Sequence, residues 1–175
     1  MQKWLRILIA FLFLFSVLGF ADDEPGKQVP TDKWKVVFVT SQETAGEDGK
    51  AENVFDEDTA TIWHTQWQDE QPAHPHGFVI DLGKMYIITG FTYQARIGNV
   101  NGVIREYQFF VGSKPKKFGK PVSEGEFEYE GDDEAGRNKL VTFKPVKGRF
   151  IKLKSISAIN EGPFASCAEF IVYYK

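Results

Sequence analysis

Short strand-like segments alternating with turn clusters constrain the fold of this chain more than any other feature. From residue 34 onward, segments rich in Val, Ile, Phe, Tyr and Thr are separated by clusters of Gly, Pro, Asn and Asp, and no segment has a convincing helical pattern. Such segments favour strands and such clusters favour turns. The segments are WKVVFVTS, GFVIDLG, YIITGFTYQARI, IREYQFFVGS, GEFEYE, KLVTFKPV, GRFIKLKSIS and AEFIVYYK. Eight strands of this kind predict an all-β fold of two packed antiparallel sheets, a sandwich or a jelly roll.

Residues 1–21 have the features of a secretory signal. Lys3 and Arg6 precede an apolar run that ends in small residues at Ala21. A membrane anchor is the alternative, but the run is short for a full span and no basic flank follows it. We therefore expect cleavage after Ala21 and a secreted or periplasmic protein. Residues 22–33 are polar with two prolines and are expected to form a linker, followed by one domain over residues 34–175.

Charge and cysteine content limit the partners and the means of stabilisation. The chain has 21 Lys and Arg against 24 Asp and Glu; without Lys3 and Arg6 the formal charge is 19 − 24 = −5. This sign argues against nucleic acid or an anionic membrane surface as the main partner. Cys167 is the only cysteine, so no internal disulfide is possible, and we expect it to be a small buried side chain. Packing or a metal ion must therefore stabilise the domain.

An oxygen-rich turn is the first candidate metal site. The stretch NVFDEDTATIW, residues 53–63, places Asp56, Asp58, Thr59 and Thr61 close together. Calcium takes six to eight oxygen ligands, including backbone carbonyls, although an ordinary Asx turn has the same composition. Glu169 is a second anomaly, because its strand is otherwise apolar and a buried carboxylate needs a partner or a metal. One calcium ion bridging the turn and the last strand would explain both features.

An aromatic loop follows this turn. TIWHTQW, residues 61–67, opens onto QDEQPAHPHG, and a core strand would neither break its alternation in this way nor run into Pro72 and Pro75. We expect Trp63 to belong to the core. Trp67, with His64 three residues before it, is typical of a binding loop that combines a flat apolar face with hydrogen-bonding groups.

Other polar residues of this loop have simpler interpretations. His74 and His76 have metal-ligand spacing but lie among prolines without a third ligand, so we expect exposed loop residues. Asp69 or Glu70 with His64 could in principle serve a hydrolase. Neighbouring acids in a polar loop are usually solvated, and no nucleophile motif such as G-x-S-x-G is present. We therefore expect no enzymatic activity.

Taken together, these segments resemble the discoidin domain, also called the F5/8 type C domain, and most of all its family 32 carbohydrate-binding modules. The resemblance runs from about Trp34 to Tyr174 and rests on five stretches in order. They are NVFDEDTATIWHTQW, GFVIDLGKMYIITGFTYQAR, NGVIREYQFFV, GRFIKLKSIS and NEGPFASCAEFIV. It implies an eight-stranded antiparallel jelly-roll β-sandwich.

The resemblance also implies a structural calcium ion. Glu57 departs from the family, which often has glycine there; if this position needs a positive φ, glutamate costs about 1 kcal/mol. The implied ligands are the carbonyls of Asn53, Asp58 and Ala168, the carboxylates of Asp56 and Glu169, and the carbonyl and hydroxyl of Thr61.

Finally, the resemblance implies a site for a glycan with a terminal galactose-type residue. An aromatic ring covers the apolar face of the sugar, while guanidinium and amide groups bind neighbouring hydroxyls. The matching positions are His64, Trp67, Arg96, Asn101 and Phe164, with His64 expected at the axial O4 hydroxyl. The alternative within the same family is an adhesion module that binds a protein or a phospholipid.

Overall fold

The computed structural model describes residues 25–129 and 137–175, so the expected signal sequence at 1–21 lies outside the described residues. Within them, no helix is long and apolar enough to cross a membrane. The strands are β1 (Lys27–Gln28), β2 (Lys35–Val39), β3 (Trp63–His64), β4 (His76–Gln94), β5 (Glu106–Gly112), β6 (Ser123–Glu126), β7 (Asn138–Ser155), β8 (Ser166–Cys167) and β9 (Glu169–Tyr174); η1 (Thr31–Lys33) and η2 (Ala51–Phe55) are short 3-10 helices.

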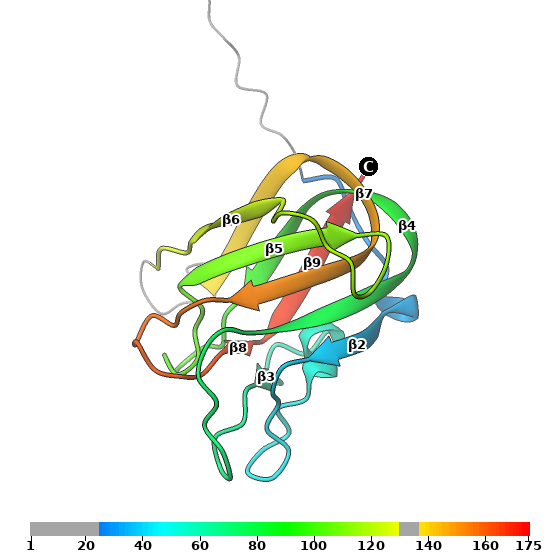
Figure 1. Cartoon of the computed structure of the whole chain (residues 1–175). Coiled ribbons are helices and arrows are strands. Elements are labelled where there is room, and N and C mark those ends of the chain that lie inside the picture. The colour runs from blue at the N-terminus through cyan, green and yellow to red at the C-terminus, as the bar shows by residue number, and fades with distance from the viewer. Residues whose placement is uncertain (1–24, 130–136) are drawn as a thin grey trace, which may run out of the picture.

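Two long strands, β4 and β7, run through both layers of a curled antiparallel sandwich (Figure 1). The first part of β4 pairs with β2, and its second part pairs with β9. The two long strands pair with each other along their length, and the last part of β7 also pairs with β5. Each layer therefore contains half of β4 and half of β7, which confirms the predicted all-β jelly-roll architecture.

Seven of the eight predicted segments form the body of a strand, whereas GEFEYE contributes only Gly125 and Glu126 to β6, and two pairs of segments are continuous. GFVIDLG and YIITGFTYQARI form β4, and KLVTFKPV and GRFIKLKSIS form β7. The register of β4 shifts between Asp81 and Tyr86, where Gly83 has a φ of 84° that glycine adopts without strain. The Arg149 guanidinium donates two hydrogen bonds to the Asp81 carboxylate, at 2.7 and 2.9 Å, and so connects the two long strands beside this bend.

Aromatic side chains fill the space between the layers. Phe91 packs against Phe109 and Phe170 with ring centroids 4.4 and 5.2 Å apart, and Phe78 packs on Phe170 and Trp63. All five side chains are buried. The prediction that Trp63 belongs to the core is confirmed, and Trp63 connects this core to the loops beyond β3.

Residues 22–33 were expected to form a linker. This is wrong for residues 25–33, the part of that range that the structure describes. Backbone pairing of Lys27 with Tyr174 joins β1 to β9, and the Val29 N–H group donates to the Val172 carbonyl at 2.8 Å. Val29 is buried in the core. The segment around β1 is mostly polar in sequence, but an edge strand can form through backbone hydrogen bonds alone. A pattern of side chains does not reveal such pairing.

Candidate functional site

Loops from four parts of the sequence meet at the end of the sandwich opposite the C-terminus (Figure 1). The short strands β3 and β8 pair there and place His64 opposite Ser166. Thr65 and Ala165 extend this pairing with hydrogen bonds of 2.9 and 3.0 Å. The Ser166 N–H group also donates to the Gly102 carbonyl at 2.7 Å. Three of the loops, around residues 64, 101 and 165, are thereby fixed relative to one another.

A buried carboxylate attaches the fourth loop. Glu43 is inaccessible to solvent and accepts backbone hydrogen bonds from Ala45, Gly46, Trp67 and Gln68 at 2.7–2.9 Å. These hydrogen bonds, led by the one from Trp67, lower the pKa of Glu43 to about 2. The carboxylate is therefore ionised at neutral pH and holds the loop of residues 43–49 against the aromatic loop.

These loops surround a depression of about 290 Å³, called here the loop depression. The side chain of Phe164 lies next to it, with its ring centroid 5.6 Å from that of His64. The structure thus brings together all five residues that the sequence assigned to sugar binding. The residues lining the loop depression are Glu47, His64, Trp67, Arg96, Asn99 and Asn101.

The Trp67 indole is held at two points. Its Nε1–H group donates to Glu47 Oε1 at 2.9 Å. The adjacent edge of the six-membered ring lies over Gly46, so close that a Cβ atom there would be 2.6 Å from Cζ2 and Cη2. The side chain is only half-buried, so a fixed aromatic surface remains at the wall of the loop depression.

His64 offers an unsatisfied acceptor at the same wall. Its ring is 1% exposed, and Nδ1 lies 2.7 Å from the Thr65 carbonyl, so Nδ1 carries the hydrogen and donates it. Nε2 then has a free lone pair, and it has no hydrogen-bond partner among the described residues. Burial lowers the pKa of His64, which keeps the imidazole neutral at pH 7.

Arg96 and Asn101 supply donors and acceptors to the lining of the same depression. The half-buried Arg96 side chain lines the loop depression and makes no hydrogen bond or ion pair with the rest of the described chain. Asn101 is fixed through its backbone: its N–H group donates to Asn99 Oδ1 at 2.8 Å, and its carbonyl accepts from the Ser166 hydroxyl at 3.3 Å. Its side chain makes only a 3.4 Å contact with Asn160.

Three residues of this site were not predicted from the sequence: Glu43, Glu47 and Asn99. Glu43 acts through backbone groups up to 25 residues away, and Glu47 is one of three acids in the polar loop 43–49, so neither has a distinguishing local pattern. Asn99 could have been suspected from its place in the Arg96–Asn101 segment, where a short amide side chain favours a turn.

The expectation that His74 and His76 are exposed is wrong. His76 is 1% exposed, and its Nε2 lies 3.0 Å from the Pro72 carbonyl and 2.8 Å from the Pro163 carbonyl. His74 is half-buried with its ring centroid 4.9 Å from that of His76. His76 therefore connects the aromatic loop to the loop that carries Phe164.

The prediction that Cys167 is a buried side chain is confirmed, and burial raises the pKa of its thiol.

The predicted calcium turn follows η2 and brings side-chain and backbone oxygen atoms of Asp56, Asp58 and Thr61 close together. The Thr61 hydroxyl lies 2.7 Å from Asp56 Oδ2 and 2.9 Å from the Asp58 carbonyl oxygen. The Asp58 carboxylate instead caps the turn by accepting from the Ala60 N–H group. Glu57 has a φ of 68°, the positive value considered above. The side chain of Asn53 donates to the backbone carbonyls of Asp48 and Ile62, which fixes Asn53 beside the turn.

The surroundings of Glu169 suit a cation bound between this turn and β9. Glu169 is 8% exposed, Oε1 has no hydrogen-bond partner among the described residues, and burial together with the neighbouring Asp56 raises its pKa to about 7. Two adjacent carboxylates without a cationic partner suit a divalent ion. Within residues 25–129 and 137–175 no three His, Cys, Asp or Glu side chains gather as a metal site. A calcium ion here would therefore rely on hydroxyl and carbonyl oxygens besides these two carboxylates.

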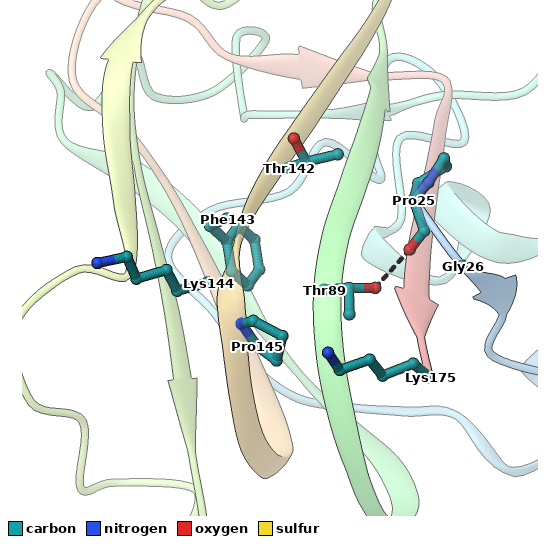
Figure 2. Close-up of a pocket in the computed structure, with 8 residues that line it drawn as sticks. All are labelled: Pro25, Gly26, Thr89, Thr142, Phe143, Lys144, Pro145 and Lys175. Carbon is teal, nitrogen blue, oxygen red and sulfur yellow. Dashed lines mark hydrogen bonds between the residues drawn. The ribbon is translucent and has the colours of Figure 1, made fainter. Parts of the chain in front are cut away.

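A different depression, of about 490 Å³, lies at the C-terminal end of the sandwich (Figure 2). The Thr89 hydroxyl in its wall donates to the Pro25 carbonyl. Phe143 is its one aromatic residue, and that ring packs partly against the core. Its chemistry therefore differs from that of the loop depression. Its lining includes Pro25, Thr89, Thr142, Phe143, Lys144 and Lys175.

The fold and the loops together define a β-sandwich module with a depression formed by the loops at one end. Comparison with known families gives a match to the F5/8 type C domain over residues 38–170. This chain belongs to that family.

Two solved modules from Clostridium perfringens are similar over nearly their whole length. CpGH89CBM32-5, in complex with GalNAc-β-1,3-galactose, is 32% identical with a TM-score of 0.73, and the match covers 84% of this chain and 99% of that one. The family 32 module of NanJ, in complex with galactose, is 26% identical with a TM-score of 0.68, covering 83% and 96%.

Curated relatives are much longer than this chain. A sialidase of Micromonospora viridifaciens is 30% identical over 138 residues, which is 78% of this chain but 21% of the sialidase. An A type blood N-acetyl-α-D-galactosamine deacetylase of Flavonifractor plautii is 29% identical over 126 residues, 72% of this chain and 15% of the deacetylase. The chain thus spans about a fifth or less of these enzymes.

Proposed function

We propose that this chain is a secreted, non-catalytic carbohydrate-binding module that recognises a terminal galactose or a related sugar. The observation that carries the proposal is the convergence of Trp67, His64 and Arg96 on one depression of about 290 Å³. A size near 300 Å³ is at the small end of ligand sites, as expected for one sugar unit. The modules bound to galactose and to GalNAc-β-1,3-galactose support this ligand class.

Each side chain has a distinct part in this proposal. The Trp67 indole stacks on the apolar face of the pyranose, and Phe164 closes one side. The Arg96 guanidinium and the Asn101 amide bind neighbouring hydroxyls, because both have unused hydrogen-bonding capacity among the described residues. The neutral His64 accepts a hydrogen bond from the axial O4 hydroxyl at Nε2, which selects galactose over glucose.

The expected affinity is weak. Sugar hydroxyls are well hydrated before binding, so each hydrogen bond contributes only about 1 kcal/mol net. We expect a binding free energy of roughly −4 to −7 kcal/mol, equivalent to a Kd of about 1 mM to 10 µM.

Calorimetric titration of the chain with D-galactose and D-glucose tests the proposal. Galactose is expected to bind in this range and glucose at least about tenfold more weakly, and Trp67→Ala and His64→Ala should each abolish measurable binding. Phe38→Ala is the matched control, because Phe38 is a 54% exposed aromatic residue on β2 that does not line the loop depression. Galactose binding that survives both site substitutions would overturn the assignment.

The proposal includes a structural calcium ion at the turn that follows η2. Asp56 and Glu169 would hold it with their carboxylates, Thr61 with its hydroxyl and carbonyl, and Asn53, Asp58 and Ala168 with their carbonyls. The unpartnered Oε1 atom of Glu169 is the main support. The ion would attach the turn to β9 without taking part in sugar binding.

The proposal also includes export of the protein. N-terminal sequencing of the secreted protein tests this part, and the expected first residue is Asp22.

An adhesion module for a protein or a phospholipid is the second candidate. One observation favours it: Ile97 and Val100 are 48% and 46% exposed on the loop between Arg96 and Asn101. Apolar side chains on a loop tip can insert into a membrane surface or a protein groove. Sedimentation with phosphatidylserine vesicles discriminates between the candidates. The sugar-binding proposal predicts no sedimentation, whereas the second candidate predicts binding that Val100→Ser weakens.

A further inference from the structure

The loop depression does not end at Arg96. A second and larger depression, of about 580 Å³, adjoins it and shares Glu47 and Arg96 as lining residues. We call it the adjoining depression. One wall consists of residues 59–62, which continue from the oxygen-rich turn, and Ile97 lines it as well. The side chains of Glu47 and Arg96 thus form a common border between the two depressions.

The lining of the adjoining depression combines apolar groups and hydroxyls. Ile97 is 48% exposed, and Ile62 and Ala60 add further apolar surface to the lining. Thr59 supplies a hydroxyl group, whereas the Thr61 hydroxyl is taken up by Asp56 and Asp58 of the oxygen-rich turn. A pyranose presents the complementary combination, with C–H groups on its faces and hydroxyls around its rim. The exposed part of Ile97 is apolar surface that a bound sugar face would cover.

The two shared residues have free hydrogen-bonding capacity. Glu47 Oε1 accepts from the Trp67 indole, but Oε2 accepts no hydrogen bond from the rest of the described chain. The Arg96 guanidinium makes no hydrogen bond or ion pair within the described residues, so its donors can serve ligand groups on both sides. A ligand that crosses from one depression to the other would therefore be bound at the crossing point.

We propose that the adjoining depression is a second saccharide subsite, which binds the sugar unit linked to the galactose in the loop depression. This inference rests on the proposed function, since it assumes that the first unit is bound there. The true ligand is then a disaccharide or a longer glycan end. Ile97 provides the apolar contact to the second unit, and Glu47 and Arg96 bind hydroxyls near the linkage.

Titration with methyl β-galactoside and with a panel of galactose-terminated disaccharides of different linkages tests this proposal. At least one disaccharide is expected to bind about fivefold more tightly than methyl β-galactoside. Ile97→Ser should remove this gain and leave the affinity for methyl β-galactoside unchanged. Val100→Ser is the matched control, because Val100 is equally exposed on the same loop but lines neither depression. Both substitutions affect exposed side chains, so the melting temperature should not change.

The outcomes separate the two proposals. If methyl β-galactoside binds but no disaccharide binds more tightly, the second subsite is refuted while the proposed function stands. A disaccharide gain that persists in Ile97→Ser, or that Val100→Ser removes equally, also refutes the subsite. Failure of every galactoside to bind overturns the proposed function and this inference with it.

Discussion

Gly46→Ala is the substitution that most sharply tests whether Trp67 forms the sugar platform. A Cβ atom at position 46 would lie 2.6 Å from Cζ2 and Cη2 of Trp67, whereas an ordinary contact begins at 3.4 Å. The ring edge must therefore move by about 0.8 Å, the difference 3.4 − 2.6. The Nε1–H bond to Glu47 lies on the same side of the indole, so this side cannot slide away from Gly46 without breaking that bond, and the indole must tilt.

The consequence for binding follows from this tilt. A tilted indole loses its parallel contact with the sugar face, which costs about 1 kcal/mol and weakens galactose binding roughly fivefold. Folding should be almost unaffected, within about 0.5 kcal/mol, because Gly46 is exposed and its φ is not in the left-handed region.

Calorimetric titration with galactose, together with a thermal melt, measures both effects. Gly119→Ala is the control, since a Cβ atom at Gly119 would meet no heavy atom within 4 Å. Unchanged galactose affinity in Gly46→Ala, at an unchanged melting temperature, would refute the role of Trp67 as platform.

Three further predictions concern stability. Calcium at about 100 times its Kd should stabilise the protein by about 2.7 kcal/mol, and Glu169→Gln should abolish this shift in a thermal melt; a shift that remains would exclude the proposed ligand set. The Glu43 carboxylate, with a pKa of about 2 against a usual 4.5, should lose its stabilising contribution as pH falls from 4.5 toward 2, because the unfolded chain then binds more protons. Melts of wild type and Glu43→Gln from pH 6 to 3 check this, and parallel curves would contradict it. Arg149→Met should lower the melting temperature by breaking both hydrogen bonds to Asp81, whereas Lys147→Met, two residues away on β7, should not.

Much of the fold could be predicted because its strands obey local rules. Each of the eight segments has β-favouring residues between turn clusters, and the buried Phe and Trp side chains report the core directly. The continuity of β4 could not be predicted. Gly83 looks like a turn residue in the sequence, and only the pairing of both halves with β7 shows that the strand bends there without ending.

The site was predictable where residues act through their own side chains. Trp67 is recognisable because an aromatic side chain beside a polar, turn-rich loop is typical of a binding surface, whereas Arg96 and Phe164 were identified only through the resemblance to the family. Glu43 and His76 were missed or misjudged because their partners are backbone groups distant in sequence: the N–H groups of Trp67 and Gln68, and the Pro163 carbonyl. Such contacts depend on how the loops are folded, and no local pattern reports them.

The central claim is that the loops opposite the C-terminus bind a galactose-type sugar. Amide and indole NMR spectra recorded during a galactose titration test it most directly. The account predicts the largest shift changes at the Trp67 indole N–H and along the backbone from Arg96 to Asn101. Changes centred instead on Thr89 and Lys175, around the depression at the other end of the sandwich, or no changes at all, would contradict it.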